Sequence, residues 1–495
     1  MTTRVTGNSS PPAAPQVERQ PAALPTLFFT EMWERFSYYG MRALLVLYLV
    51  NALGYERADA LAVYGTYTAL VYLTPILGGY LADRFLGYRK AILIGGLVMA
   101  MGHFAMAIPA LLMPALGLII IGNGFFKPNI STLVGSLYRE RDPRRDGGFT
   151  LFYIGINLGA FLAPLIAGTL GERIGWHWGF GAAGVGMLLA VLLFVRGQHK
   201  LGKAGLLPGQ DRLDRRDWLH IVLVSALMLP LVTAVIAVGS ALAPLWSRIG
   251  TELKVGIPTA AFIAFLAWQQ RTCTREEWHR VLAIVILGVF VIFFWMGFEQ
   301  AGGTMNLFAD KLTDRHLGSW EIPASYFQAI NPLGIVLLGP VIAALWVRLD
   351  TSRYALSTPA KMAIGMIILG LGFIVLAIAD SRAQAVGQVG PWWLVAVYLL
   401  HTLGELCLSP VGLSMVTKLA PARVAALLMG IWYLANAAAN YLAGILEELL
   451  KGSSMPLYWF LVGSSIGAGV VLLAITPLVK RLMHEGRSTS PSPAR

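Results

Sequence analysis

Charged residues are scarce in this chain. Asp, Glu, Lys and Arg account for 13% of its 495 residues, whereas soluble domains carry about 25%. Hydrophobic residues account for 56%, and the mean hydropathy is +0.65. These values exclude an ordinary soluble domain. Because apolar segments of about 20 residues recur between short charged loops, the sequence predicts an all-α membrane protein rather than a β-barrel.

Cysteine is equally scarce, with two residues in the chain. Cys273 falls in a predicted loop and Cys407 in a predicted membrane helix, so we expect neither a disulfide framework nor a metal site. The first 24 residues are polar and lack the apolar core of a secretory signal peptide. We expect residues 1–24 to form a disordered cytoplasmic tail.

The net charge of +12 would suggest a nucleic-acid partner in a soluble protein. Here the basic residues are distributed unevenly between alternate loops. Most of the 38 Lys and Arg residues fall on the side that holds both termini, whereas Arg35, Arg42 and Lys127 fall within predicted helices. This excess follows the positive-inside rule and predicts cytoplasmic termini. We therefore expect a multi-pass membrane protein with both termini in the cytoplasm and without a nucleic-acid partner.

Fourteen membrane helices are predicted in a six, two, six arrangement. The first six are expected at about 25–53, 60–84, 89–108, 113–138, 150–174 and 178–197. The extra pair is expected at about 218–244 and 255–270. The last six are expected at about 280–308, 322–347, 357–379, 391–419, 424–450 and 456–482.

The same pattern divides the chain into five parts. These are a tail (1–24), an N-terminal six-helix bundle (25–197), a cytoplasmic linker with the two extra helices (198–279), a C-terminal six-helix bundle (280–482) and a second tail (483–495). Two six-helix halves indicate a transporter that binds its substrate between them, near the middle of the membrane. The extra pair carries almost no embedded charge, so we expect it at the periphery.

The predicted helix at 25–53 carries a polar stripe. At about 100° per residue, five of its side chains fall within a sector of roughly 100°. They are Glu31, Glu34, Arg35, Tyr38 and Arg42. Charge inside a membrane is costly, so such residues usually face a water-filled cavity and pair with one another. The remaining embedded charges are Lys127, Glu299 and Glu405.

This set of embedded charges permits two interpretations. Burial raises the pKa of a carboxyl group and a nearby cation lowers it, so breaking and remaking an ion pair can bind and release a proton. That behaviour suits a proton-coupled transporter. The alternative is a set of static ion pairs that hold the helices together.

Residues 78–90 read GGYLADRFLGYRK and resemble the cytoplasmic loop signature of the major facilitator superfamily. The matching positions are Asp83, Arg84, Gly87 and Arg89. An aspartate here can accept hydrogen bonds from the N-terminus of a neighbouring helix, while the basic residues hold the loop. We interpret this segment as a gate and topology element; the alternative is a charged loop with chance spacing.

Residues 31–40 read EMWERFSYYG and resemble the E-x-x-E-R-F-x-Y-Y-G signature of the proton-dependent oligopeptide transporter family. Every fixed position is present. Further matches follow in order at 125–129 (FFKPN), 152–159 (FYIGINLG) and 404–410 (GELCLSP). The resemblance spans nearly the whole chain, including the two extra helices of bacterial members. It implies a major facilitator fold in a bacterial cytoplasmic membrane and a proton-coupled symporter that imports di- and tripeptides by alternating access.

A peptide carries an amine and a carboxylate at a nearly fixed separation, so it suits a site with cations on one side and an acid on the other. Supported by the resemblance, we expect Arg35 and Lys127 to bind the carboxylate. Glu405 is expected to bind the amine, with help from Asn331 and Ser409.

The rest of the expected site is an amide and a set of aromatic walls. Asn157 can hydrogen-bond to the peptide backbone. The aromatic side chains combine apolar surfaces with polar tips, which tolerates varied peptide side chains. They are Tyr38, Tyr39, Tyr72 and Trp432. An isolated aromatic residue in a membrane helix can equally serve packing or anchor the helix at the membrane surface.

The resemblance also implies that Glu31 and Glu34 act with Arg35 and Lys127 in proton coupling. Protonation of one acid would free a cation for the substrate carboxylate. Glu299 is a further candidate for proton coupling.

Two ion pairs are expected to act as gates. We expect Arg42 to pair with Glu299 at an outer gate, and Lys127 to pair with Glu405 at an inner gate. Glu405 would then serve both the substrate and the gate. His103, His177 and His401 are interpreted as structural or interface residues; for His401, one helical turn before Glu405, the alternative is a place at the cavity.

Three other functions are alternatives to peptide symport. The same fold could take up another anion or zwitterion, such as nitrate or an amino-acid conjugate. The sequence contains no H-E-x-x-H, G-x-S-x-G or glycine-rich nucleotide motif, which disfavours an enzyme. A repeated six-helix half disfavours a channel. We expect a monomer that needs no cofactor because the proton gradient drives it, with peptides, protons and the lipid bilayer as partners.

Overall fold

The computed structural model describes residues 19–139, 142–207, 212–247, 260, 263–264, 266–352, 355–419 and 425–484. The chain is almost entirely helical, which confirms the predicted all-α fold class. Within the described part, ten helices are long and apolar enough to cross a membrane. Helix α1 (Leu24–Asn51) is not one of these ten, and it is the helix that carries the polar stripe.

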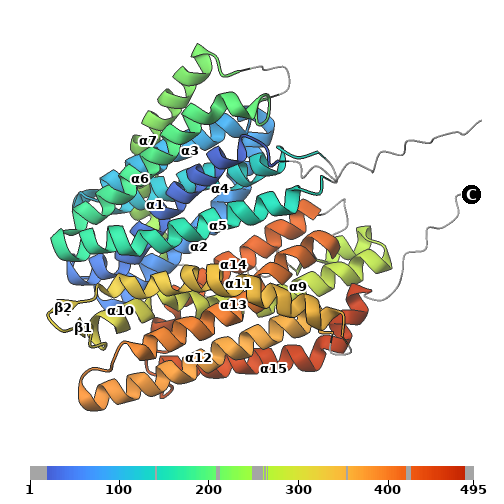
Figure 1. The fold of residues 1–495 in the computed structure, drawn as a ribbon. Helices are drawn as coiled ribbons and strands as arrows, with labels where there is room; N and C mark the ends of the chain where they lie inside the picture. Colours follow the sequence, from blue (N-terminus) through green and yellow to red (C-terminus); the bar gives the residue numbers. More distant parts are fainter. Residues whose placement is uncertain are drawn as a thin grey trace, which may run out of the picture.

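The helices form two halves (Figure 1). The N-terminal half, drawn blue to green, contains α1, α2 (Arg57–Leu81), α3 (Tyr88–Ala105), α4 (Leu112–Gly135), α5 (Arg145–Ala163) and α6 (Trp176–Gly197). The C-terminal half, drawn yellow to red, contains α9 (Arg275–Phe298), α11 (Ile330–Asp350), α12 (Thr358–Val386), α13 (Trp392–Leu419), α14 (Ala425–Leu449) and α15 (Leu457–Met483). A short helix, α10 (Thr304–Lys311), lies between α9 and α11 in the sequence.

The region between the halves contains α7 (Arg215–Ser247), which packs on α3 and α4. Several apolar side chains of α7 are exposed, including Leu219, Val222 and Leu223. This is the peripheral position expected for the first extra helix. The second extra helix, predicted at 255–270, falls partly outside the described residues, and both predicted tails fall largely outside them. The predicted domain boundaries stay predictions.

The two ends of the molecule differ. We call one the hairpin end because it carries the two-stranded hairpin of β1 (His316–Leu317) and β2 (Trp320–Glu321). The opposite end, where α1 begins and α15 ends, is called the tail end. A turn of 3-10 helix, η7 (Ala324–Ala329), follows the hairpin and leads into α11.

Polar contacts between the halves concentrate at the hairpin end. The Glu172 carboxylate, in the π-helical turn η4 (Leu170–Ile174), accepts hydrogen bonds from the backbone N–H groups of Ala324 and Ser325 at 2.7 and 3.0 Å. Arg173 pairs with Glu321 at 3.2 Å. Further contacts are Thr169 with Tyr326, Asn51 with Asp310 and Lys311, and Arg57 with Glu447.

A close contact between α2 and α14 also joins the two halves. A Cβ atom on Gly65 of α2 would lie 2.5 Å from the Gly444 backbone of α14, so glycine is needed for this approach. The pair between Arg42 and Glu299 also joins the halves; nearer the tail end, no hydrogen bond or ion pair between two described residues does so. In this structure the two halves are therefore joined at the hairpin end.

The substitution Glu172→Gln tests whether the Glu172 carboxylate holds the two halves together at the hairpin end. Glutamine keeps one acceptor but loses the second acceptor and the charge, which should cost roughly 1 kcal/mol, or about fivefold in the closed-to-open ratio at this end. Distances between spin labels placed on the two halves at the hairpin end should shift toward longer values. The matched control is Asp314→Asn, because Asp314 lies at the same end and bonds to His316 of its own half. An equal shift in both variants would contradict the role of Glu172.

Candidate functional site

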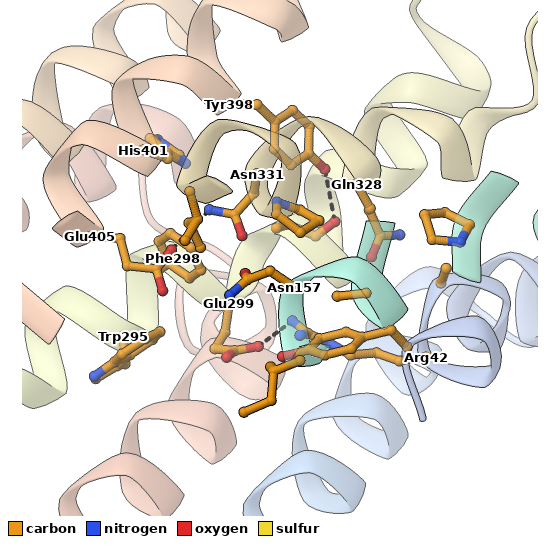
Figure 2. Close-up of a pocket in the computed structure, with 18 of the residues that line it drawn as sticks. Arg42, Asn157, Trp295, Phe298, Glu299, Gln328, Asn331, Tyr398, His401 and Glu405 are labelled. Atoms are coloured by element: carbon orange, nitrogen blue, oxygen red, sulfur yellow. Dashed lines mark hydrogen bonds and ion pairs between the residues drawn. The ribbon is translucent and has the colours of Figure 1, made fainter. Parts of the chain in front are cut away.

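A cavity of about 140 Å³ lies between the two halves. The N-terminal half lines it with Tyr39 and Arg42 of α1, Tyr72 of α2, and Tyr153 and Asn157 of α5. The C-terminal half lines it with Trp295, Phe298, Glu299, Gln328, Asn331, Tyr398, His401 and Glu405 (Figure 2). The volume is below the roughly 300–1,000 Å³ of typical ligand pockets, which favours a compact ligand or a cavity that widens.

The C-terminal wall presents hydrogen-bond acceptors. Asn331 donates through Nδ2 to Glu405 Oε2 at 2.8 Å and to Thr402 Oγ1 at 3.1 Å. Both amide hydrogens are thereby used, so Asn331 Oδ1 remains an acceptor. No described Lys or Arg pairs with Glu405. A carboxylate beside an amide oxygen is suited to bind an ammonium group.

One ion pair joins the halves across the cavity. Arg42 of α1 pairs with Glu299, which follows α9 in the 3-10 turn η6 (Glu299–Gly302) (Figure 2). Arg42 Nε also donates to Tyr64 Oη at 2.6 Å. The guanidinium carbon of Arg42 lies 5.7 Å from the centre of the Tyr39 ring. This is the pair expected at the outer gate; its gating role stays a prediction.

A second charge cluster lies on α1 beside the cavity. Arg35 Nη2 donates to Glu34 Oε1 at 2.7 Å, and Arg35 Nε lies 3.3 Å from Glu31 Oε1. All three side chains are buried. Asn123 of α4 contacts Glu34 at 3.5 Å, whereas Glu31 Oε2 has no partner among the described residues. Two carboxylates thus hold Arg35, which does not line the cavity.

Lys127 lies behind the cavity wall. Its Nζ atom is 4.8 Å from the centre of the Tyr72 ring, and Tyr72 lines the cavity. Lys127 forms no ion pair within the described part of the chain. The expected pair between Lys127 and Glu405 is absent from this structure, because the halves are joined at the hairpin end and not on the side where these two residues would meet.

The other expected site residues divide into two groups. Tyr39, Tyr72, Asn157, Asn331 and Glu405 line the cavity. Arg35, Tyr38, Lys127, Ser409 and Trp432 do not. Tyr38 stacks on Tyr67 with ring centres 6.5 Å apart, and Trp432 is buried. Their substrate roles stay predictions.

Several lining residues were not predicted from the sequence, including Tyr153, Gln328 and Tyr398. His401, for which a place at the cavity was the alternative to a structural role, also lines it. Helical periodicity could have found some of them. Tyr398 and His401 precede Glu405 by seven and four positions, so all three share one face of α13.

The predicted loop motif lies at the tail end. Gly87 has a φ of +72°, which favours glycine. Arg89 donates to the backbone oxygens of Ala204 and Gly202 at 2.7 and 2.6 Å. Arg89 therefore holds the segment after α6. That the basic residues hold the loop of the motif itself, and that Asp83 and Arg84 act in gating, stay predictions.

Comparison with known proteins identifies similar chains. The sequence profile of the POT family matches residues 89–460. An uncharacterized transporter of Bacillus subtilis, YclF, is 41% identical, with 94% of this chain and 95% of that protein aligned. A di-/tripeptide transporter of Lactococcus lactis is 34% identical, with 94% and 97% aligned. The crystal structure of a peptide transporter, POT, in complex with sulfate is 40% identical, with a TM-score of 0.80 and 94% and 96% of the two chains covered.

A double-mutant cycle tests the energetic role of the pair between Arg42 and Glu299. Arg42→Gln or Glu299→Gln alone leaves a buried unpaired charge, which typically costs about 3–5 kcal/mol. The double variant leaves neither charge and should be less destabilised than the sum of the single variants. Thermal unfolding in detergent measures all four proteins. Strictly additive losses would contradict a direct, buried pair.

Proposed function

The chain belongs to the POT family of transporters, and we propose that it imports di- and tripeptides in symport with protons by alternating access. The observation that carries this proposal is the cavity between the halves, where Glu405 and Asn331 present acceptors opposite Arg42 and the tyrosines of the N-terminal half. The di-/tripeptide transporter that aligns with 94% of this chain supports the substrate class.

We place the peptide amine against Glu405 and the Asn331 amide oxygen. The amide of Asn157 donates to the Tyr153 backbone oxygen at 2.9 Å, which leaves its Oδ1 atom to accept from a peptide N–H. Tyr39, Tyr72 and Tyr153 supply apolar walls with polar tips. The peptide carboxylate points toward the N-terminal half, where Arg35 and Lys127 are its proposed partners.

Proton uptake would release Arg35. In the described structure two carboxylates hold its guanidinium group. Protonation of Glu31 would remove one of these charges, and Glu31 Oε2 has no hydrogen-bond partner among the described residues. Arg35 could then turn to the substrate carboxylate, assisted by Lys127. Glu34, which keeps its hydrogen bonds to Arg35, would retain the side chain near the cavity.

Alternating access would exchange one ion pair for another. The uneven distribution of basic residues supports a cytoplasmic tail end and an external hairpin end. The pair between Arg42 and Glu299 would then close the external side, and opening that side would bring Lys127 to Glu405 at the cytoplasmic side. We propose a monomer in a bacterial cytoplasmic membrane.

Uptake of a simple anion such as nitrate is less well supported. Glu405 lines the cavity without an ion-pair partner among the described residues, and the lining cation Arg42 is already paired with Glu299. The Glu405 carboxylate would therefore repel an anion that carries no amine. A zwitterion related to a peptide would fit the same acceptor wall.

Uptake of radiolabelled dialanine into proteoliposomes tests the proposal. An inward proton gradient should drive accumulation, and a protonophore should abolish it. Glu31→Gln and Lys127→Ala should each lose gradient-driven uptake by tenfold or more, a barrier change of about 1.4 kcal/mol or greater. Glu31→Gln should keep peptide-for-peptide exchange. Lys451→Ala, an exposed lysine of the hairpin end, is the matched control. Wild-type uptake by Lys127→Ala would show that its assignment is wrong.

The same assay tests the amine site. Wild-type protein should prefer dialanine to N-acetyl-dialanine as a competitor, because acetylation removes the ammonium charge. Glu405→Gln should reduce this preference by about tenfold, the value of a charge-assisted hydrogen bond. An unchanged preference would move the amine site away from Glu405.

A further inference from the structure

A second cavity, of about 270 Å³, lies at the tail end, apart from the central cavity. The 3-10 turn η5 (Gln198–Leu201) joins α6 to the segment that leads into α7. Seven residues line the cavity: Arg89, Gln198, His199, Gly202, Arg212, Leu213 and Trp218. Two carry guanidinium groups, and none of these seven residues is an acid.

Arg89 is buried without a carboxylate partner in the described structure. Its guanidinium group donates to the backbone oxygens of Ala204 and Gly202. These two backbone oxygens accept hydrogen bonds from Arg89 but do not neutralise its charge, and buried charges are normally paired.

The described acids nearest in the sequence to Arg212 and Trp218 are already engaged. Asp217 accepts from Lys90 Nζ at 2.5 Å and from the N–H of Asp214 at 3.0 Å. Asp214 accepts from the N–H of Asp217 at 2.8 Å. These contacts cap the start of α7 and join it to α3. Neither carboxylate pairs with Arg89, whose positive charge has no acidic partner among the described residues.

Other lining groups are available as donors. Gln198 Nε2 is buried and has no hydrogen-bond partner among the described residues. Arg212 is exposed and forms no ion pair with a described residue. A buried amide donor without a partner costs free energy unless something in the cavity accepts from it. The cavity thus combines an unsatisfied donor, an uncompensated charge and a second guanidinium group.

We propose that this cavity binds a phosphate-type oxyanion, whether the phosphate of an anionic lipid headgroup or a free phosphate ion. A phosphate group offers several acceptor oxygens, and arginine matches its geometry. The cavity also lies beside the first turns of α7, whose Leu219, Val222 and Leu223 are exposed. Acyl chains could follow these side chains, and basic pockets between membrane helices bind anionic headgroups.

The bound group would contact α3, η5 and the start of α7 together. Its negative charge would compensate Arg89, and Gln198 would gain its missing acceptor. Binding should therefore stabilise the protein and fix the linker and α7 to the N-terminal half. This property is separate from substrate transport and does not depend on the proposed function.

Thermal unfolding of the purified protein in a neutral detergent tests the proposal. The midpoint is followed while short-chain phosphatidylglycerol, short-chain phosphatidylcholine or potassium phosphate is added at matched ionic strength. A saturable rise with phosphatidylglycerol alone supports a lipid headgroup. A saturable rise with phosphate, with or without phosphatidylglycerol, supports a site open to free anions.

Two variants localise the effect. Gln198→Leu removes the unpartnered amide at similar volume, and Arg212→Ala removes an exposed guanidinium; Arg89 is kept because it holds the linker. Each substitution should weaken the apparent affinity for the phosphatidylglycerol or phosphate that stabilises the wild-type protein about tenfold, as expected for a lost charge-assisted contact. Arg216→Ala is the matched control, because Arg216 is exposed and does not line the cavity.

Four results would overturn the proposal. They are no saturable rise with either phosphatidylglycerol or phosphate, an equal rise with phosphatidylcholine, an unchanged affinity in both cavity variants, and an equal loss in Arg216→Ala. If Arg212→Ala does not fold, Gln198→Leu decides alone, because it leaves every charge in place.

Discussion

A charged side chain between membrane helices has to be compensated, and this constraint organises the molecule. Arg35 is compensated by Glu31 and Glu34 on its own helix, and Arg42 by Glu299 of the other half. Two other embedded charges lack an ion-pair partner among the described residues. Within the described structure, Glu405 has the amide of Asn331 for its partner, and Lys127 has the face of the Tyr72 ring. One of these side chains belongs to each half, so an acid and a base that lack an ion-pair partner among the described residues are divided between the two parts that would move.

The contacts that join the halves at the hairpin end explain why Glu405 and Lys127 do not pair with each other in this structure. Glu172 accepts from two backbone N–H groups across the interface, and Gly65 lets α2 approach the Gly444 backbone. These contacts bring Arg42 to Glu299, while no described polar contact joins the halves nearer the tail end. A zwitterionic peptide carries one charge for each of the two unpaired side chains. In the proposed cycle, peptide and protons supply the compensation that the halves supply to each other when the tail end closes.

Much of this arrangement could be predicted from the sequence, and the rest depended on helix packing. Embedded charge is rare, so the stripe on α1 and the pair between Arg42 and Glu299 were predictable from residue type and position. The lining of the cavity was not, because the rotation of a membrane helix is set by its neighbours. Trp432 and Tyr38 were expected in the wall but are buried in the packing, whereas His401 and Tyr153 reach the cavity. Gln328 comes from the 3-10 turn before α11, which has no apolar periodicity to mark it.

The central claim is that peptide and proton cross together because the same buried charges bind both. The most direct measurement follows the internal pH of proteoliposomes that contain a trapped pH-sensitive dye, with no imposed gradient and the membrane potential held at zero. Adding dialanine outside should acidify the interior at a rate that saturates with dialanine concentration, and protein-free liposomes should not respond. Entry of dialanine without internal acidification would contradict the account.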